Sequence, residues 1–208
     1  MNATRLLLAS ASPRRRDLLA QAGYVFEVCP AAVDEIDPGY LSVAESTLHH
    51  ARVKARAVAD LFFGGPERNA PPSAPTVVVG VDTLVALDGE RLGKPVDLDE
   101  ARSMLRRLGG RVHQVYSGIW MIARSAEGER QLGGLEKSDV TFHPLDDERI
   151  EHYLARIEPL DKAGAYAAQD TGPQSVVAAI QGSRTNVIGL PMKRFARMLA
   201  EIGASTTR

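Results

Sequence analysis

Apolar and polar positions follow different periods in successive blocks of the first half of the chain. Residues 5–9 form an apolar run of strand length, and Ser12-Pro13 then supplies a helix N-cap followed by a first helical residue. Residues 44–62 place apolar side chains at alternating steps of four and three, which predicts one long amphipathic helix. Residues 76–79 are wholly apolar and predict a buried central strand.

The second half of the chain predicts a long strand pair followed by shorter elements. Val112–Ala123 and Leu132–Phe142 are joined by a short segment that contains glycine, so we expect them to form an antiparallel pair. Further strands are expected at 24–29 and 176–180, helices from the Asp97 cap to 108, from 146 to 155 and from 191 to 202, and a loop at 182–190. Because strands alternate with helices and some neighbouring strands are antiparallel, the sequence predicts an α/β fold with a mixed sheet.

Length and charge limit the classes of protein to which the chain can belong. Its 208 residues predict one large domain or two intimate lobes. The 25 basic and 26 acidic residues nearly cancel, which argues against broad binding of nucleic acid or of acidic membranes. An anionic substrate would therefore need a local cluster of cations.

The sequence gives no sign of export or of membrane insertion. Its one cysteine, Cys29, cannot form an internal disulfide, which fits a reducing compartment. The N-terminal apolar run Leu6–Ala9 is far too short for a signal sequence or a membrane span. We therefore expect a soluble, cytoplasmic protein with no membrane partner.

Ser10–Arg16 is the first segment whose residues suggest a binding site. A turn of small residues between a strand and a helix exposes backbone N–H groups and the positive end of the helix dipole. Arginines at that end oppose the dipole, and a bound anion would remove the conflict. The alternative is a solvated arginine face beside an ordinary cap. The glycine and lysine pattern of a P-loop is absent.

Asp82 follows the apolar run at 76–79 and is the second candidate. A carboxylate at the end of a strand in an α/β sheet suits a metal ligand or a general base, although a turn-forming aspartate is the plain alternative. Lys94 precedes a proline and could reach a phosphate, although a surface lysine is the plain alternative. Lys54 lies at the edge of a helical apolar stripe, where a lysine can also extend its charged end to solvent without any role in binding. Glu35 lies in a polar loop, where solvation alone explains it.

Two later segments and the histidines complete the candidates. Residues 161–169 combine small residues with polar groups and have no amphipathic period, and the loop at 182–190 is bounded by glycines. The five histidines have no metal-ligand spacing, and the adjacent His49 and His50 would point in different directions on their helix. Zinc-protease, paired-cysteine, serine-hydrolase and RNA-binding motifs are absent.

Eight segments in a fixed order carry a more specific signal than any one of them alone. They are LLLASASPRRRDLL, VDE after the second strand, HARVKARAVA, VVVGVDTLVALDGERLGKP, HQVYSGI, SDVTF, PLDKAGAYAAQ and NVIGLP. Together, from Leu6 to Leu199, they resemble the Maf-like, or septum-formation-inhibitor-like, family of nucleoside triphosphate pyrophosphatases. The resemblance implies that residues 1–208 form a single domain of two lobes around a long mixed sheet, similar to the inosine triphosphate pyrophosphatases, with the active site in the central cleft.

The resemblance also implies an activity and roles for individual residues. Family members cleave the α–β phosphoanhydride of a nucleoside triphosphate with a divalent cation, and they tend to form dimers. We therefore expect Mg²⁺ or Mn²⁺ as cofactor, a small-molecule nucleotide as substrate, a homodimer, and no nucleic-acid partner. The implied catalytic residues are Asp82 as proton acceptor, Lys54 and Lys94 on the phosphate side, and Glu35 as a second acidic residue for metal or water. Phosphate binding is implied for Ser10, Arg14 and Arg15, and metal binding for Asp82 and Glu35.

Three positions resemble the branch of the family that acts on dTTP and UTP. These are Arg14, Thr83 and Gln169. The branch that acts on 7-methyl-GTP tends to have Trp, Gln and Glu at the corresponding places. This chain departs from the usual family pattern at Ser117, Asp170 and Arg184, and the last two could alter the loops near the base.

Two other functions remain open at this level. A nucleotidyltransferase also holds a triphosphate with Ser, Arg and Lys, but it releases pyrophosphate only when a second substrate is present. A non-enzymatic regulator of septation would act through a protein partner, and its cellular effect would survive Asp82→Asn.

Overall fold

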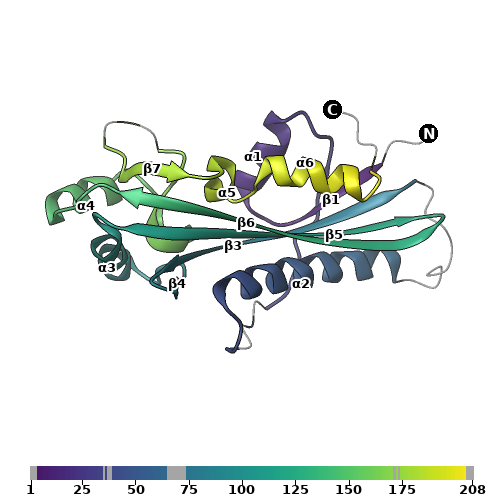
Figure 1. Ribbon diagram of the computed structural model, residues 1–208, viewed down its shortest axis with the longest axis horizontal. Helices are drawn as coiled ribbons and strands as arrows, with labels where there is room; N and C mark the ends of the chain where they lie inside the picture. Colours follow the sequence, from purple (N-terminus) through teal and green to yellow (C-terminus); the bar gives the residue numbers. More distant parts are fainter. Residues whose placement is uncertain are drawn as a thin grey trace.

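A mixed seven-stranded sheet forms the centre of the computed structural model, which describes residues 4–34, 36, 39–64, 74–170, 172 and 174–204. The strand order is β2-β1-β3-β5-β6-β7, and β4 pairs with β3 (Figure 1). The strands are β1 (Arg5–Ala9), β2 (Glu27–Val28), β3 (Thr76–Leu87), β4 (Glu90–Leu92), β5 (Val112–Ser125), β6 (Gly128–Phe142) and β7 (Val177–Gln181). β2, β1 and β3 are parallel, and the other pairs are antiparallel. The expected α/β fold with a mixed sheet is confirmed.

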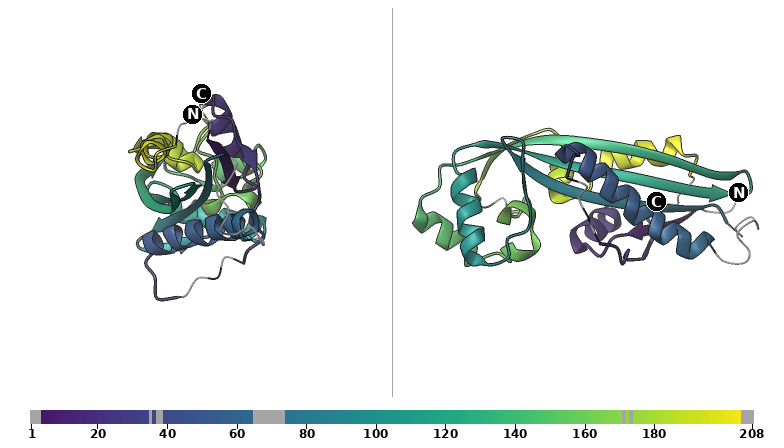
Figure 2. Two further views of the ribbon diagram at one scale, coloured as in Figure 1. Left: turned by 90° about the vertical axis from the view of Figure 1, so that its right-hand side faces the viewer. Right: turned by 90° about the horizontal axis from the view of Figure 1, so that it is seen from below.

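Helices flank both faces of this sheet. They are α1 (Pro13–Gln21), α2 (Val43–Phe63), α3 (Leu98–Leu108), α4 (Asp147–Leu154), α5 (Arg184–Ile188) and α6 (Met192–Glu201), with 3₁₀ turns η1 (Pro159–Asp161) and η2 (Ala163–Ala165). Helix α2 crosses one face, and α1 and α6 lie on the other (Figure 2). Helices α3 and α4 gather with β7 at one end of the long strands. That the whole chain makes up one domain stays a prediction.

The apolar composition of β1 follows from this layering. Successive side chains of a strand point to opposite faces, so a strand that is covered on both faces must be apolar throughout. Leu7 and Ala9 pack with Ala55 and Val58 of α2, whereas Leu6 and Leu8 belong to a second cluster with residues of α1 and α6. A third cluster, around Phe142, lies between the sheet and helices α3 and α4.

Helix caps and one turn have the chemistry that their residues predict. Ser42 and Glu45 form both bonds of a capping box at the start of α2. Asp97 accepts a hydrogen bond from the backbone N–H of Glu100 at the start of α3. The β3–β4 hairpin turns through Asp88 and Gly89, whose φ angles are +53° and +85°.

The structure corrects two expectations about secondary structure. The strand expected at 24–29 shrinks to Glu27–Val28, because this sheet edge is exposed and its residues pair only with β1. The loop expected at 182–190 contains helix α5, which begins where the Ser183 side chain accepts a hydrogen bond from the N–H of Asn186. Five helical residues between glycines are too few to give an apolar period.

His113 gives the fold a pH dependence. Its side chain is fully buried, with Nε2 2.9 Å from the hydroxyl of Tyr166, and its ring packs against Phe142. Burial lowers the pKa of His113 from 6.5 to about 4. Between these two values the unfolded chain binds a proton that the folded chain does not, so stability falls as the pH falls through this window.

We expect His113→Gln to remove this dependence. The parent should lose on the order of 3 kcal/mol of its unfolding free energy through this group between pH 7 and 4, since one pKa unit corresponds to about 1.4 kcal/mol. Urea unfolding at several pH values should therefore give a shallower acid slope for the variant. Equal slopes for the two proteins would contradict the assignment.

Candidate active site

A cleft of about 620 Å³ opens between the turn that follows β1 and the segment from η1 to Gln169. Its volume falls in the range of roughly 300–1,000 Å³ that is usual for small-molecule sites. Its cationic lining residues are Arg14, Arg15, Lys54, Arg91, Lys94 and Lys162, and its acidic ones are Asp82 and Asp161. Although the chain has a net charge of −1, the cleft has the local excess of cations that an anionic substrate needs.

Eight of the nine site residues expected from the sequence line this one cleft. They are Ser10, Arg14, Arg15, Lys54, Asp82, Thr83, Lys94 and Gln169. The ninth, Glu35, lies outside the described residues. The segments that contain the eight are far apart in the sequence, so the fold brings them together as the ordered motifs predict. Which of them take part in chemistry stays a prediction.

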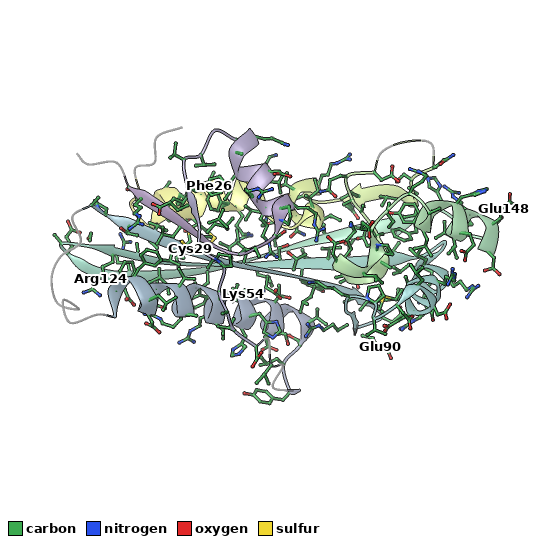
Figure 3. All side chains as sticks on the ribbon, turned by 180° about the vertical axis from the view of Figure 1, so that it is seen from behind. Phe26, Cys29, Lys54, Glu90, Arg124 and Glu148 are labelled. Atoms are coloured by element: carbon green, nitrogen blue, oxygen red, sulfur yellow. The ribbon has the colours of Figure 1, made fainter. Side chains whose placement is uncertain are left out.

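Asp82 is a buried carboxylate held by two side chains of α2. It is 4% exposed and lies on β3, with Lys54 Nζ donating to Oδ1 at 2.6 Å and His50 Nδ1 3.3 Å from Oδ2. His50 and Lys54 are four residues apart and so share one face of the helix. Lys54 lies on α2 near the middle of the sheet (Figure 3).

His50 is a site residue that the sequence analysis missed. His50 was considered in the sequence analysis only beside His49, and adjacent helical residues point in different directions. The informative spacing is the four residues from His50 to Lys54, which places both side chains on one face of α2. The expected apolar stripe of α2 is also partly wrong: Phe62 is 42% exposed, while Thr47, His50 and Lys54 are buried. The face of α2 that meets the sheet therefore carries polar groups toward Asp82.

Two glycines allow α2 to lie this close to the sheet. A Cβ atom on Gly80 of β3 would lie 2.0 Å from the carbonyl oxygen of Ala51, and one on Gly118 of β5 would lie 2.7 Å from that of Thr47. Gly118 pairs directly with Asp82 across the strands. The helix backbone thus packs directly on the strands beside Asp82, which brings Lys54 within hydrogen-bonding distance.

The environment of Asp82 favours its ionised form. Burial alone would raise the pKa of Asp82, but the hydrogen bond with His50 and the positive charge of Lys54 outweigh burial and hold the pKa at about 2. The carboxylate is therefore charged at every physiological pH. In this state it is a good cation ligand but a weak proton acceptor.

Arg15 is a buried guanidinium fixed by groups from three parts of the chain. It is 9% exposed, and it donates from Nη1 to Ser10 Oγ at 2.8 Å, from Nε to the Gly189 carbonyl at 2.9 Å and from Nη2 to Thr83 Oγ1 at 3.2 Å. These bonds join the start of α1 to the residue after β1, to β3 and to the residue after α5. The direction of the guanidinium is thus set before any ligand binds.

Arg14 points to the other wall of the cleft. Its Nη1 lies 2.9 Å from Asp161 Oδ2 and its Nη2 donates to the Asp161 carbonyl at 3.3 Å, while Lys162 also pairs with the Asp161 carboxylate. Burial alone would raise the pKa of Asp161, but the hydrogen bonds from Lys162 and Arg14 lower it. Arg14 therefore adjoins the segment that leads to Gln169, unlike Arg15.

Lys94 and Gln169 are exposed at the rim of the cleft. The segment that carries Lys94 is tied to η2 by a hydrogen bond of 3.0 Å from the N–H of Gly164 to the carbonyl of Gly93. Both side chains can therefore reach a ligand without breaking the core.

The donor set fits one kind of divalent-cation site. Within the described ranges, no three His, Cys, Asp or Glu side chains gather as a metal cage. Mg²⁺ is often held instead by one or two carboxylates together with substrate phosphates and water. An ionised carboxylate has about four lone-pair positions, so Asp82 can bind a cation besides accepting from Lys54 and His50.

Comparison with known proteins identifies the family. A family model described as Maf-like protein matches residues 5–202. This chain belongs to the Maf-like family. The dTTP/UTP pyrophosphatase of Pelotomaculum thermopropionicum is 42% identical over 198 residues, covering 95% of this chain and 96% of that protein. That of Symbiobacterium thermophilum is 42% identical over 199 residues, covering 96% and 94%. The resemblance seen in the sequence is confirmed.

Solved structures offer a weaker likeness. The chain is similar to a nucleoside-triphosphatase, or dITP/XTP pyrophosphatase, from Mycobacterium abscessus, with a TM-score of 0.41 and 13% identity over 96% of this chain and 98% of that one. At this score the likeness carries no weight. In the part of the chain that the structure describes, no helix combines the length and the apolar content needed to cross a bilayer.

Proposed function

We propose that this Maf-like chain hydrolyses dTTP and UTP to the monophosphate and pyrophosphate in the cationic cleft. The shared name of its relatives supports nucleoside triphosphate pyrophosphatase activity as such. The observation that carries the proposal is the buried Asp82 carboxylate, which lines a cleft with six cationic side chains. This arrangement suits hydrolysis of a polyphosphate.

Charge neutralisation explains the cations. A triphosphate carries about four negative charges near neutral pH, and they must be balanced before a water molecule can approach phosphorus. Arg15 meets the phosphates together with the Ser10 turn and the N-terminus of α1, where backbone N–H groups and the helix dipole also favour anions. Lys54 and Lys94 stabilise the charge that develops on the leaving pyrophosphate.

Asp82 accepts the proton in the hydrolytic step. Water attacks the α-phosphorus, the bond from this phosphorus to the oxygen that bridges to the β-phosphate breaks, pyrophosphate leaves with the bonding electrons, and the water proton passes to Asp82. A divalent cation, when bound by Asp82 with Glu35 as a further candidate ligand, would make the water more acidic and neutralise phosphate charge. An anionic substrate that draws Lys54 away also raises the pKa of Asp82, which improves it as a base.

Product analysis tests the proposed function. The purified chain is incubated with Mg²⁺ or Mn²⁺ and one of dTTP, UTP, CTP, ATP, GTP or 7-methyl-GTP, in water enriched in ¹⁸O. We expect monophosphate and pyrophosphate in equal amounts with no second substrate, and the label in the monophosphate. Release of orthophosphate with a diphosphate, or pyrophosphate release only with an acceptor, would contradict hydrolysis at the α–β bond. Dependence on the cation and a homodimeric state stay predictions.

Arg14 and Gln169 suit recognition of thymine or uracil. The edge of these bases presents two carbonyl acceptors around one N–H donor. An amide can both donate to and accept from such an edge, and a guanidinium can add a donor. Arg14 adjoins the wall that leads to Gln169, and both side chains line the cleft. A site built for these bonds rejects other bases because its polar groups would stay unpaired.

We expect Gln169→Glu to reduce pyrimidine selectivity. The change replaces an amide donor by an acceptor, so the ratio of kcat/KM for dTTP to that for ATP should fall by about tenfold or more. Gln174→Glu is a matched control, since Gln174 lies outside the cleft lining. If 7-methyl-GTP is the preferred substrate of the parent, the assignment to pyrimidine nucleotides is wrong although pyrophosphatase activity stands.

We expect Lys94→Ala to weaken productive binding of the triphosphate. The loss of one exposed cation should raise KM for dTTP by about tenfold, while inhibition by dTMP changes less than about twofold because dTMP lacks the β and γ phosphates. Lys193→Ala, an exposed lysine of α6 outside the cleft lining, is the control. Equal losses for both ligands would place Lys94 at the α-phosphate or the sugar.

A further inference from the structure

A line of hydrogen bonds runs from Arg15 through Thr83 to two residues that do not line the cleft, Ser117 and Asn186. Arg15 Nη2 donates to Thr83 Oγ1 at 3.2 Å, Thr83 Oγ1 lies 2.9 Å from Ser117 Oγ, and Ser117 Oγ donates to the Asn186 carbonyl at 3.2 Å. The side chains of Ser117 and Asn186 are fully buried. We call Thr83, Ser117 and Asn186 the Arg15 relay.

The chemistry of its two ends fixes the direction of the relay. A guanidinium can only donate, so Thr83 accepts from Arg15. A backbone carbonyl can only accept, so the single hydroxyl proton of Ser117 goes to Asn186. In the Thr83–Ser117 bond Thr83 is then the donor, and the Gly189 carbonyl at 3.3 Å is a second acceptor for the same proton. With that proton on Ser117, each hydroxyl accepts from the cleft side and donates away from it, which turns the negative end of each O–H dipole toward the buried cation.

Asn186 fastens the far end of the relay to the sheet. Its side-chain amide donates to the Val115 carbonyl of β5 at 3.0 Å and to Ser138 Oγ of β6 at 2.9 Å. These bonds hold α5, and the next residue after α5 is Gly189, whose carbonyl accepts from Arg15 Nε. Gly189 has φ +131°, which a residue with a side chain rarely adopts. Two contacts of Arg15 therefore depend on Asn186.

We propose that Ser117 and Asn186 are positioning residues for Arg15, and that Thr83 acts through Arg15 rather than by touching the base. The inference deepens the proposed function and rests on it for the role of Arg15. The one hydroxyl proton of Thr83 has acceptors in Ser117 and in the Gly189 carbonyl, so donating this proton to a base would break its bond within the protein. The relay instead holds a flexible arginine in the direction in which it meets the triphosphate.

A double-mutant cycle separates positioning from general packing. We expect Ser117→Ala to lower kcat/KM for dTTP by about tenfold in the parent and by less than about twofold in Arg15→Ala, because a residue that acts only through Arg15 has nothing left to position. The affinity for inorganic triphosphate, measured by calorimetry, should follow the same pattern. Ser175→Ala is the matched control: Ser175 is also buried and accepts one backbone hydrogen bond, from Val177, away from the cleft.

Variants that keep the hydroxyl group distinguish loss of the relay from general loss of structure. Thr83→Ser and Ser117→Thr should stay within about threefold of the parent. An equal loss for Ser117→Ala in both backgrounds, no loss in the parent, or a loss in Ser117→Thr as large as that in Ser117→Ala would overturn the relay. If the parent releases no pyrophosphate from any nucleotide, the proposed function fails, and the cycle on inorganic triphosphate still decides the relay.

Discussion

Asp82→Asn should lower kcat by about 10²–10⁴-fold at saturating divalent cation, the range for loss of a general base. The amide cannot take the water proton and is a poorer cation ligand. It also removes the negative charge that lies 2.6 Å from Lys54 Nζ, in a site where the Lys54 side chain is 11% exposed. We therefore expect a lower melting temperature as well, with a loss of about 1–3 kcal/mol in unfolding free energy.

The matched control for this change is Asp88→Asn. Asp88 is an exposed aspartate at the end of the same strand region, it pairs with Arg111, and its positive φ suits asparagine. It should keep kcat within about twofold. If Asp82→Asn retains near-normal turnover while its circular dichroism matches the parent, Asp82 is not the proton acceptor.

Arg15→Lys should lower kcat/KM for dTTP by about 10²-fold, although the positive charge is kept. Lysine has one point-like cation and cannot hold the planar arrangement by which Arg15 reaches Ser10, Thr83 and Gly189 together. Buried acceptors would be left without donors, and the charge would no longer be directed at the phosphates.

Arg16→Lys is the control for Arg15→Lys, because Arg16 is the next residue on the same helix and its side chain is 57% exposed. Steady-state kinetics on both variants decide the matter. A loss in Arg16→Lys equal to that in Arg15→Lys, or a loss in Arg15→Lys below about threefold, would contradict a special role for Arg15.

Much of the fold was predictable because its signals are local. The apolar run of β1, the Ser12-Pro13 helix start and the capping box at Ser42 each specify a structure within a few residues. Asp82 was predictable as a candidate because a carboxylate in a largely apolar stretch calls for a reason, although it lies inside β3 and not at a strand end as expected. The family resemblance then grouped it with the arginines and lysines of distant motifs.

The missing parts of the site depend on contacts between distant segments. His50 becomes significant only once the buried face of α2 is known, and that face is set by Gly80 and Gly118 rather than by an apolar period. The bond from Arg15 to Gly189 spans 174 residues, and it requires α5, which has no periodic signal. No residue spacing in the sequence predicts a hydrogen bond between these two segments.

The close approach of α2 at Gly80 and Gly118 limits how this protein can be altered. Filling glycines with alanine is a common way to raise thermal stability by restricting the unfolded chain. At these two positions a methyl group would push the helix off the strands, and Lys54 and His50 would move away from Asp82 with it. Engineering for stability and natural sequence variation must therefore both keep glycine at these two positions.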